Sequence, residues 1–458
     1  MWFDKLASRR VFFICTVIAG AFFLGLIAAT WHFRGRIDHP ALLTFWWISN
    51  GAVIYSLYPL ARNRRRAGSG SVTGRVVAVV SVHEQNESDL RACIWSILNQ
   101  SRVVVDEVHV VDDGSTHAPV QPFAHPRVRW HRTEHGGARA AQRYVLDRLD
   151  PEDWDFVMAV DGNCVLDEHA VECQLREFAQ PNVVATTAMV VMRNGGHNML
   201  TRLVDLNTGT GVMRPTRRSA LRAVQIGPGA LSVYRARVLF EHERPVVDPA
   251  ADGDDHCLAR YPDLDGEVVP VPEAIVWTTA PTDFATVRRQ LMRTAARRWR
   301  VLATTLAPEP PNRNRTRAIV LLRLLCGPAW VFCAVVLLVE AASGETSQAP
   351  WLILYGALYL LVRYAKAGHY LAVRPAMSRS EKLRTWILLT PVEAVCNLLG
   401  VGAIRFLALF PSRASGRPDG EPYGRSPLEL PSAEGDTALP VGSTTVYYSG
   451  YMSEKTNS

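Results

Sequence analysis

The chain has 458 residues, of which 48% are hydrophobic and 20% are charged, and 50 Lys and Arg against 43 Asp and Glu give a net charge of +7. This apolar content excludes an intrinsically disordered chain, and eight cysteines without a CxxC pair exclude a small disulfide scaffold. The length predicts roughly two to four structural units, and a mean hydropathy of +0.02 predicts a mixture of apolar and soluble segments.

Two long uncharged segments stand near the start of the chain. Val11–Trp31 and Ala41–Ala61 are each long enough to cross the hydrocarbon core of a bilayer as a helix. Arg62–Arg66, which contains four arginines, follows the second segment directly. Because basic residues favour the cytoplasmic side of a membrane, residues 1–66 are predicted to form a transmembrane hairpin with both ends in the cytosol.

Residues 67–311 are predicted to form a cytosolic α/β domain. In chain order, the expected elements are a strand over Arg75–Val82, a helix over Asp89–Asn99, a strand over Glu107–Val111, a helix over Arg139–Leu149 and a strand over Asp155–Val160. The strands are short and rich in β-branched residues, as in buried parallel sheets. Strand–helix repetition indicates right-handed crossovers, and therefore a parallel, Rossmann-like sheet.

Apolar segments return in the C-terminal part of the chain. They cover Ala318–Val339, Trp351–Val373 and Trp386–Phe410, and they predict a transmembrane region over residues 312–410. A proline and an arginine interrupt the last segment, so the number of crossings stays open. Residues 411–458 are rich in Pro, Gly and Ser and predict a disordered tail. The layout predicts a multi-pass plasma-membrane protein that contacts membrane lipids and has no nucleic-acid partner.

Carboxylates stand at the ends of two predicted strands. Asp112 and Asp113 end one of them, and Asp161 ends another. Ligands of parallel sheets bind beyond the carboxyl ends of the strands. A single carboxylate there is explained equally well as the cap of the next helix. Two of them near one cleft suit a divalent metal ion with oxygen ligands, and such ions often carry a diphosphate.

A series of motifs resembles the family 2 glycosyltransferases, and in particular the hyaluronan and chitin synthases. VDDGS at Val111–Ser115 is similar to the nucleotide-sugar motif of that family, and the preceding NE (Asn86, Glu87) and SILNQ (Ser96–Gln100) fit its first strand and helix. Further motifs follow in the family's order and spacing: NMLTRLVDL (Asn198–Leu206), GPGALSVYR (Gly227–Arg235), GDDH (Gly253–His256) and QLMR (Gln290–Arg293). The resemblance extends over residues 11–410.

The resemblance implies a GT-A fold with flanking transmembrane helices, and a processive, inverting hexosyltransferase that builds a polysaccharide from a UDP-sugar. Asp255 would be the general base that deprotonates the acceptor hydroxyl. Mg²⁺ or Mn²⁺, held by Asp161 and Asn163, would neutralise the leaving diphosphate. The other implied contacts are with the nucleotide sugar at Asp113, Asp161, Arg139, Gln290 and Arg293, and with a growing glycan or lipid acceptor at Asp254 and Thr294.

Three positions depart from the synthase pattern. Asn163 replaces an aspartate, Ala138 replaces a lysine beside Arg139, and Thr294 replaces a tryptophan that would offer a stacking platform. Two alternatives therefore stay open: transfer of a single sugar to a lipid or small acceptor, and a catalytically degenerate homologue that acts as a membrane scaffold. The motifs specify neither the sugar nor the linkage. In addition, Arg293 is also explained as part of an interfacial basic helix, and Asp255 as part of a solvated acidic loop.

Overall fold

The structure, a computed structural model of the whole chain, describes residues 72–117, 119–212, 230–242, 267–292 and 349–397, and isolated positions at 24, 25, 28, 31, 32, 339, 342 and 343. All of these residues belong to one compact unit, Met1–Pro422. Apart from those isolated positions, the predicted spans Val11–Trp31, Ala41–Ala61 and Ala318–Val339 lie outside the described residues, as do the predicted domain limits and the tail.

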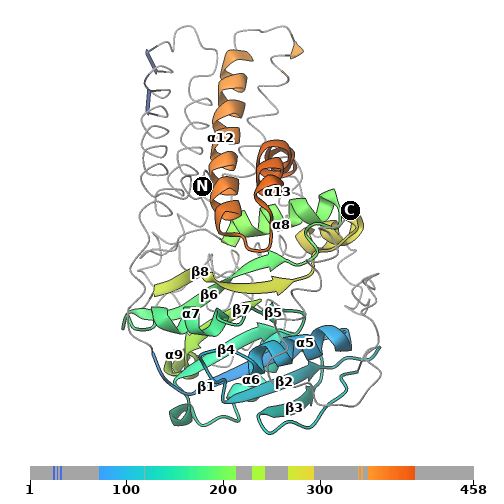
Figure 1. Cartoon of the computed structure of the whole chain (residues 1–458), viewed down its shortest axis with the longest axis vertical. Helices are drawn as coiled ribbons and strands as arrows, with labels where there is room; N and C mark the ends of the chain where they lie inside the picture. The colour runs from blue at the N-terminus through green and yellow to red at the C-terminus, as the bar shows by residue number, and fades with distance from the viewer. Residues whose placement is uncertain are drawn as a thin grey trace, which may run out of the picture. The chain divides into compact units, whose positions relative to one another are not determined.

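A single sheet runs through the domain in the order β3-β2-β1-β4-β7-β6-β8-β5 (Figure 1). Its strands are β1 (Val76–Val82), β2 (Glu107–Asp113), β3 (Val128–Thr133), β4 (Phe156–Asp161), β5 (Val165–Leu166), β6 (Val183–Met192), β7 (Leu231–Arg235) and β8 (Glu267–Thr278). The three strands predicted from the sequence are β1, β2 and β4, and they pair in parallel as expected. This confirms the predicted α/β character of the first half of the domain.

The second half of the sheet differs from the wholly parallel arrangement that we predicted. Strand β7 runs antiparallel to both of its neighbours, β4 and β6, and β5 runs antiparallel to β8. A short buried run such as Leu231–Arg235 has the composition of a strand but carries no information on direction. The strand β3 was not predicted either, because Arg129, His131 and Arg132 break up its apolar run.

Helices cover both faces of the sheet. They are α5 (Glu87–Leu98), α6 (Ala138–Leu146), α7 (Ala170–Glu177), α8 (Met199–Val212), α9 (Ala236–His242), α12 (Ala349–Val373), α13 (Arg379–Arg384) and α14 (Thr390–Val395), with short helical segments η2 (Pro151–Asp153) and η7 (Thr385–Leu389). Alternate residues of β1 point to opposite faces. Val76 and Ala78 therefore pack in one buried cluster with α5, whereas Val77 and Val79 pack in another with α6.

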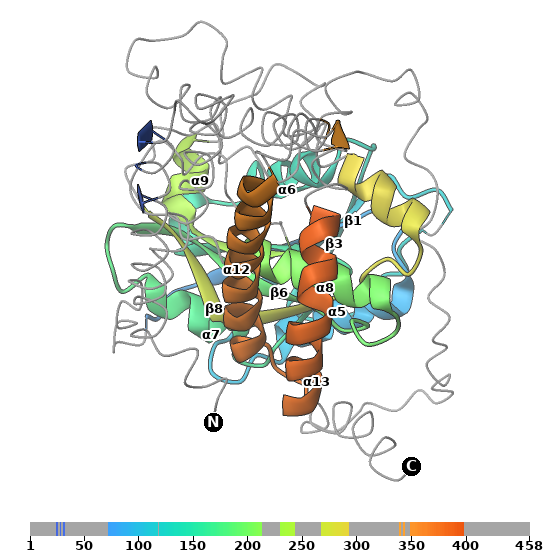
Figure 2. The same ribbon diagram turned by 90° about the horizontal axis from the view of Figure 1, so that it is seen from above.

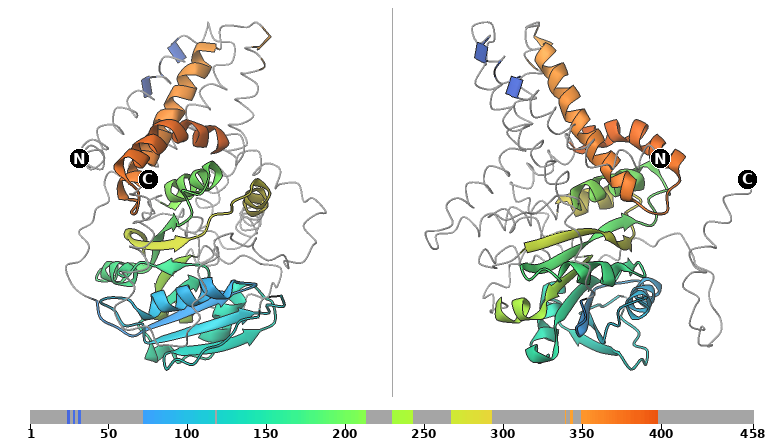
Figure 3. Two further views of the ribbon diagram at one scale, coloured as in Figure 1. Left: turned by 45° about the vertical axis from the view of Figure 1, so that its right-hand side comes forward. Right: turned by 60° about the vertical axis from the view of Figure 1, so that its left-hand side comes forward.

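Helix α8 lies between the sheet and α12 in both views of Figure 3. At the contact between the two helices, a Cβ atom on Gly209 of α8 would lie 2.0 Å from the ring of Tyr370 of α12. Only a glycine therefore permits this close approach. Tyr370 and Leu371 are fully buried with Met189 and Val191 of β6, and the segment from α13 to α14 lies beside α12 (Figure 2).

The predicted span Trp351–Val373 coincides with α12, and the described part of Trp386–Phe410 forms η7 and α14. Within the part of the chain that the structure describes, no helix is both long and apolar enough to cross a membrane. Arg363 of α12 is buried and forms a bidentate ion pair with Glu393 of α14.

A buried polar network joins α8, α12 and the end of β6. Asp205 Oδ1 accepts hydrogen bonds from the backbone N–H of Met192 (3.0 Å) and from the hydroxyl of Tyr370 (2.8 Å). Its other oxygen, Oδ2, accepts a hydrogen bond from Nε of Arg374 at 2.8 Å. The side chains of Asp205 and Arg374 are only 1% and 4% exposed, so this ion pair is shielded from solvent.

Two histidines, one on β2 and one on β3, should make the free energy of unfolding depend on pH. His109 and His131 are hydrogen-bonded ring to ring at 3.0 Å, and burial is the main cause that lowers the pKa of each below its ordinary value of 6.5. The unfolded chain therefore binds more protons between the lowered values and 6.5. Stability should rise with pH across that window and level off above it.

The variant His109→Phe tests this prediction because it keeps a ring in the site but cannot titrate. We expect the difference in unfolding free energy between the natural chain and the variant to increase with pH up to about 6.5. Denaturant unfolding at several pH values measures that difference. The exposed His197 provides the control, since His197→Ala removes a histidine outside the buried pair and should leave the contribution of that pair in place. A pH dependence that His109→Phe does not alter would contradict the prediction.

Candidate active site

The predicted carboxylates lie at one edge of the sheet. In the register of the parallel strands, Val82 of β1 is opposite Asp112 of β2, and Ser81 of β1 is opposite Asp161 of β4. Since neighbouring strands are about 4.8 Å apart, the strands that carry Asp113 and Asp161 are separated by about 10 Å. The structure thus brings Asp113 and Asp161 to the same edge, on either side of β1.

Asp113 organises the loop that leads into α6. Its Oδ1 accepts a hydrogen bond from the N–H of Gly136, and its Oδ2 accepts one from the N–H of Gly137, both at 2.8 Å. The carboxylate is almost fully buried. Gly114 follows in the left-handed region at φ 70°, where a Cβ would lie 2.8 Å from the backbone N of His135. The turn after β2 therefore requires glycine at this position.

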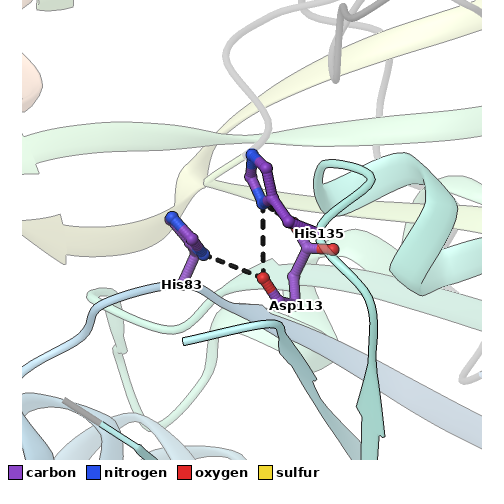
Figure 4. A group of neighbouring side chains, drawn as sticks. All are labelled: His83, Asp113 and His135. Atoms are coloured by element: carbon purple, nitrogen blue, oxygen red, sulfur yellow. Dashed lines mark hydrogen bonds and ion pairs between the residues drawn. The ribbon is translucent and has the colours of Figure 1, made fainter. Parts of the chain in front are cut away.

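Two imidazole rings stand beside Asp113 (Figure 4). His135 Nδ1 lies 3.0 Å from Asp113 Oδ2, and His83 Nδ1 lies 2.8 Å from the backbone carbonyl oxygen of Asp113. The two rings are stacked, with centroids 4.3 Å apart. Neither histidine was predicted as a site residue from the sequence, although His83 directly follows the first predicted strand.

Glu84 ties the end of β1 to the turn after β2. Its Oε1 accepts hydrogen bonds from the N–H and the hydroxyl of Thr116 (2.6 and 3.1 Å), and Oε2 accepts one from the N–H of His117 (3.0 Å). The Glu84 N–H donates to Ser115 Oγ at 2.9 Å. Glu84 has φ 47°, a backbone conformation that costs a non-glycine residue about 1–3 kcal/mol. These contacts hold it there.

This geometry changes the interpretation of the NE motif. Asn86 is the N-cap of α5, where its side chain accepts a hydrogen bond from the N–H of Ser88, and Glu87 pairs with Arg91 on the exposed side of that helix. The acidic side chain at the sheet edge is Glu84 instead. The sequence signal was available, because Glu84 stands within two residues of the end of the β-branched run of β1.

Replacing Glu84 with alanine is expected to destabilise the protein by about 1–3 kcal/mol, because the N–H groups of Thr116 and His117 lose their acceptor. Glu84→Gln keeps one acceptor oxygen and should cost less. Denaturant unfolding measures both. Glu87→Ala, on an exposed ion pair, is the matched control and should change stability by less than about 0.5 kcal/mol. Equal losses for Glu84→Ala and Glu87→Ala would contradict this assignment.

Asp161 is the last residue of β4, and Asn163 lies on the tight turn that follows. The N–H of Gly162 donates to the carbonyl of Ser81 at 3.1 Å, and the N–H of Cys164 donates to the carbonyl of Asp161 at 3.0 Å. Cys164 Sγ donates to Asn163 Oδ1 at 3.2 Å, and burial raises the pKa of this thiol well above its ordinary value. The thiol therefore stays protonated and does not offer a thiolate to a metal ion. The metal ligands that this turn offers are oxygen atoms.

The remaining predicted site residues are placed only in part. Ala138 is the first residue of α6, and Arg139 follows in its first turn, but the side chain of Arg139 lies outside the described part. Gln290 is exposed on a helix over residues 284–292. Asp254, Asp255, Arg293 and Thr294 lie outside the described residues, so their predicted roles stay predictions.

Comparison with known proteins identifies the family. Residues 74–296 match the family described as "Glycosyltransferase like family 2". A hyaluronan synthase of Streptococcus pyogenes is 28% identical over 206 residues, which cover 41% of this chain and 48% of that protein. An N-acetylglucosaminyltransferase of Azorhizobium caulinodans is 28% identical over 250 residues, which cover 51% of this chain and 62% of that protein. The chain thus spans about half the length of the hyaluronan synthases that it matches.

Among solved structures, a mannosyltransferase from Pyrobaculum calidifontis in complex with GDP-Man and Mn²⁺ is 16% identical, with a TM-score of 0.47 over 83% of this chain and 99% of that one. The match over residues 74–296 confirms the predicted family, and the mixed sheet confirms an α/β fold. The chain therefore carries a domain of glycosyltransferase-like family 2.

Proposed function

We propose that the protein transfers a sugar from a UDP-sugar to a growing glycan, with inversion at the anomeric carbon. One observation carries this proposal: Asp113 and Asp161 stand on either side of β1 at the carboxyl edge of the sheet. Ligands of α/β sheets bind at this edge. The hyaluronan synthase relative supports a polysaccharide as the product.

Asp255 is proposed as the general base. It would take the proton from the acceptor hydroxyl while that oxygen attacks the anomeric carbon on the face opposite UDP. Asp113, Arg139, Gln290 and Arg293 are proposed to hold the nucleotide and its phosphates. Asp254 and Thr294 would contact the acceptor sugar.

Asp161 and Asn163 are proposed to hold Mg²⁺ or Mn²⁺. The turn after β4 offers one carboxylate and one amide oxygen beside a protonated thiol, and oxygen donors are the ligands that these ions prefer. When bound, the ion would neutralise charge on the leaving diphosphate. Asn163 supplies no charge, which favours a weaker ion affinity than a second aspartate would give.

A membrane location and processive synthesis complete the proposal. The uncharged segments Val11–Trp31 and Ala41–Ala61 have the length and composition of membrane-spanning helices. A processive synthase of this kind would extend the polysaccharide and extrude it between its own spans. The match to an N-acetylglucosaminyltransferase supports N-acetylglucosamine as one sugar to test. The second candidate is transfer of a single sugar to a lipid or small acceptor, in which the loss of a tryptophan at Thr294 matters less.

The test is UDP release by the purified full chain with Mn²⁺, across a panel of UDP-sugars. We expect release from at least one donor, and a ladder of product lengths if synthesis is processive. Products of one added sugar would favour the second candidate. Nucleotide binding without release from any donor would contradict the proposed transfer and support a non-catalytic homologue.

A further inference from the structure

Three side chains from separate segments converge beside the predicted nucleotide site. His83 follows β1, Asp113 ends β2, and His135 lies in the loop before α6 (Figure 4). One ligand atom of each residue lies within 4.8 Å of those of the other two. This cluster is distinct from the Asp161 and Asn163 turn, which follows β4 on the other side of β1.

The cluster is organised by contacts that also suit metal binding. Asp113 is held by the N–H groups of Gly136 and Gly137, so its carboxylate is fixed in direction. His83 Nδ1 lies 2.8 Å from the backbone carbonyl oxygen of Asp113 and faces the cluster (Figure 4), so a bound ion would take the place of the proton on that nitrogen.

We propose that His83, Asp113 and His135 form a binding site for a zinc-class divalent ion. Two imidazoles and one carboxylate suit Zn²⁺, whereas Mg²⁺ and Mn²⁺ favour sites made of oxygen ligands alone. Three protein ligands leave a fourth position for water or another ligand. In a tetrahedral zinc site the ligand atoms are about 3.4 Å apart, so the cluster must contract slightly. His135, whose side chain is 48% exposed, has room to make that movement.

One consequence for the transfer reaction rests on the proposed function. Asp113 is proposed to bind the nucleotide, so zinc at this cluster would compete with the UDP-sugar for the same carboxylate. Zinc would then inhibit transfer even when Mn²⁺ saturates the turn after β4. The binding of zinc itself does not depend on the sugar-transfer proposal.

The experiment is a calorimetric titration of the purified full chain with ZnCl₂ in excess Mg²⁺. We expect one tight zinc equivalent per chain. His135→Ala should weaken that binding by at least about tenfold, and Asp113→Asn should do the same. His135→Ala is the decisive variant, because it leaves in place the hydrogen bonds that the N–H groups of Gly136 and Gly137 donate to Asp113. His197→Ala, which removes an exposed histidine outside the cluster, should bind zinc as the natural chain does.

A natural chain without a tight zinc equivalent would overturn the inference, as would a His135→Ala variant with unchanged zinc affinity. UDP release separates the two proposals. Zinc binding that is lost in His135→Ala, in a chain that releases no UDP, would support the metal site and contradict the transfer reaction. UDP release by a chain that does not bind zinc would contradict the metal site and support the transfer reaction.

Discussion

Asp255→Asn is expected to lower the rate of UDP release by about 100- to 10,000-fold, because a general base contributes rate enhancements of that order. Asparagine has a similar shape but cannot accept the proton of the acceptor hydroxyl. We expect the affinity for the UDP-sugar to change little, since the proposed donor contacts lie elsewhere. Initial rates of UDP release at saturating donor, together with equilibrium donor binding, measure the two effects.

Asp252→Asn is the matched control, because it removes a carboxylate from the same acidic segment. It should keep most of the activity. Equal losses in the two variants would mean that the segment acts through its overall charge, and an active Asp255→Asn variant would contradict the role of Asp255 as the base.

Asp205→Asn is expected to destabilise the protein by about 3–5 kcal/mol, because removal of one partner leaves the other charge of a buried ion pair uncompensated. The partner is Arg374, whose side chain is only 4% exposed. The midpoint of denaturant unfolding, followed by tryptophan fluorescence of the purified full chain, measures the loss.

The exposed ion pair between Arg143 and Asp147 at the end of α6 provides a comparison. Asp147→Asn should change the free energy of unfolding by less than about 0.5 kcal/mol. A loss in Asp205→Asn as small as that in Asp147→Asn would show that the buried network contributes little to stability.

Part of the fold follows from the sequence alone. Strands β1, β2 and β4 are buried on both faces, so their β-branched runs are readily recognised, and α5 has a clear helical spacing after its cap, Asn86. The direction of β7 could not be predicted in the same way. It depends on pairing with β4 and β6, which are far away in the chain.

The candidate site likewise contains residues that the sequence predicts and residues that it does not. Asp113 and Asp161 were predicted because they stand at the ends of recognisable strands. Glu84 and His135 were missed because their positions depend on contacts between loops: Glu84 binds the turn at Thr116, and His135 contacts Asp113. Such contacts have no sequence period. The place of Glu84 two residues after the β-branched run of β1 pointed to the sheet edge, but not to its contacts with the turn at Thr116.

The contact of Asp205 with Arg374 and Tyr370 bears on how the chain could be divided. A chain cut after residue 311 would keep Asp205 and the backbone N–H of Met192, but would lose the guanidinium and the hydroxyl that now satisfy the carboxylate. It would also expose the surface of α8 at Gly209, where Tyr370 now packs. Residues beyond the matched family domain are thus part of its folding unit, and the transferase domain is not expected to be autonomous without α12.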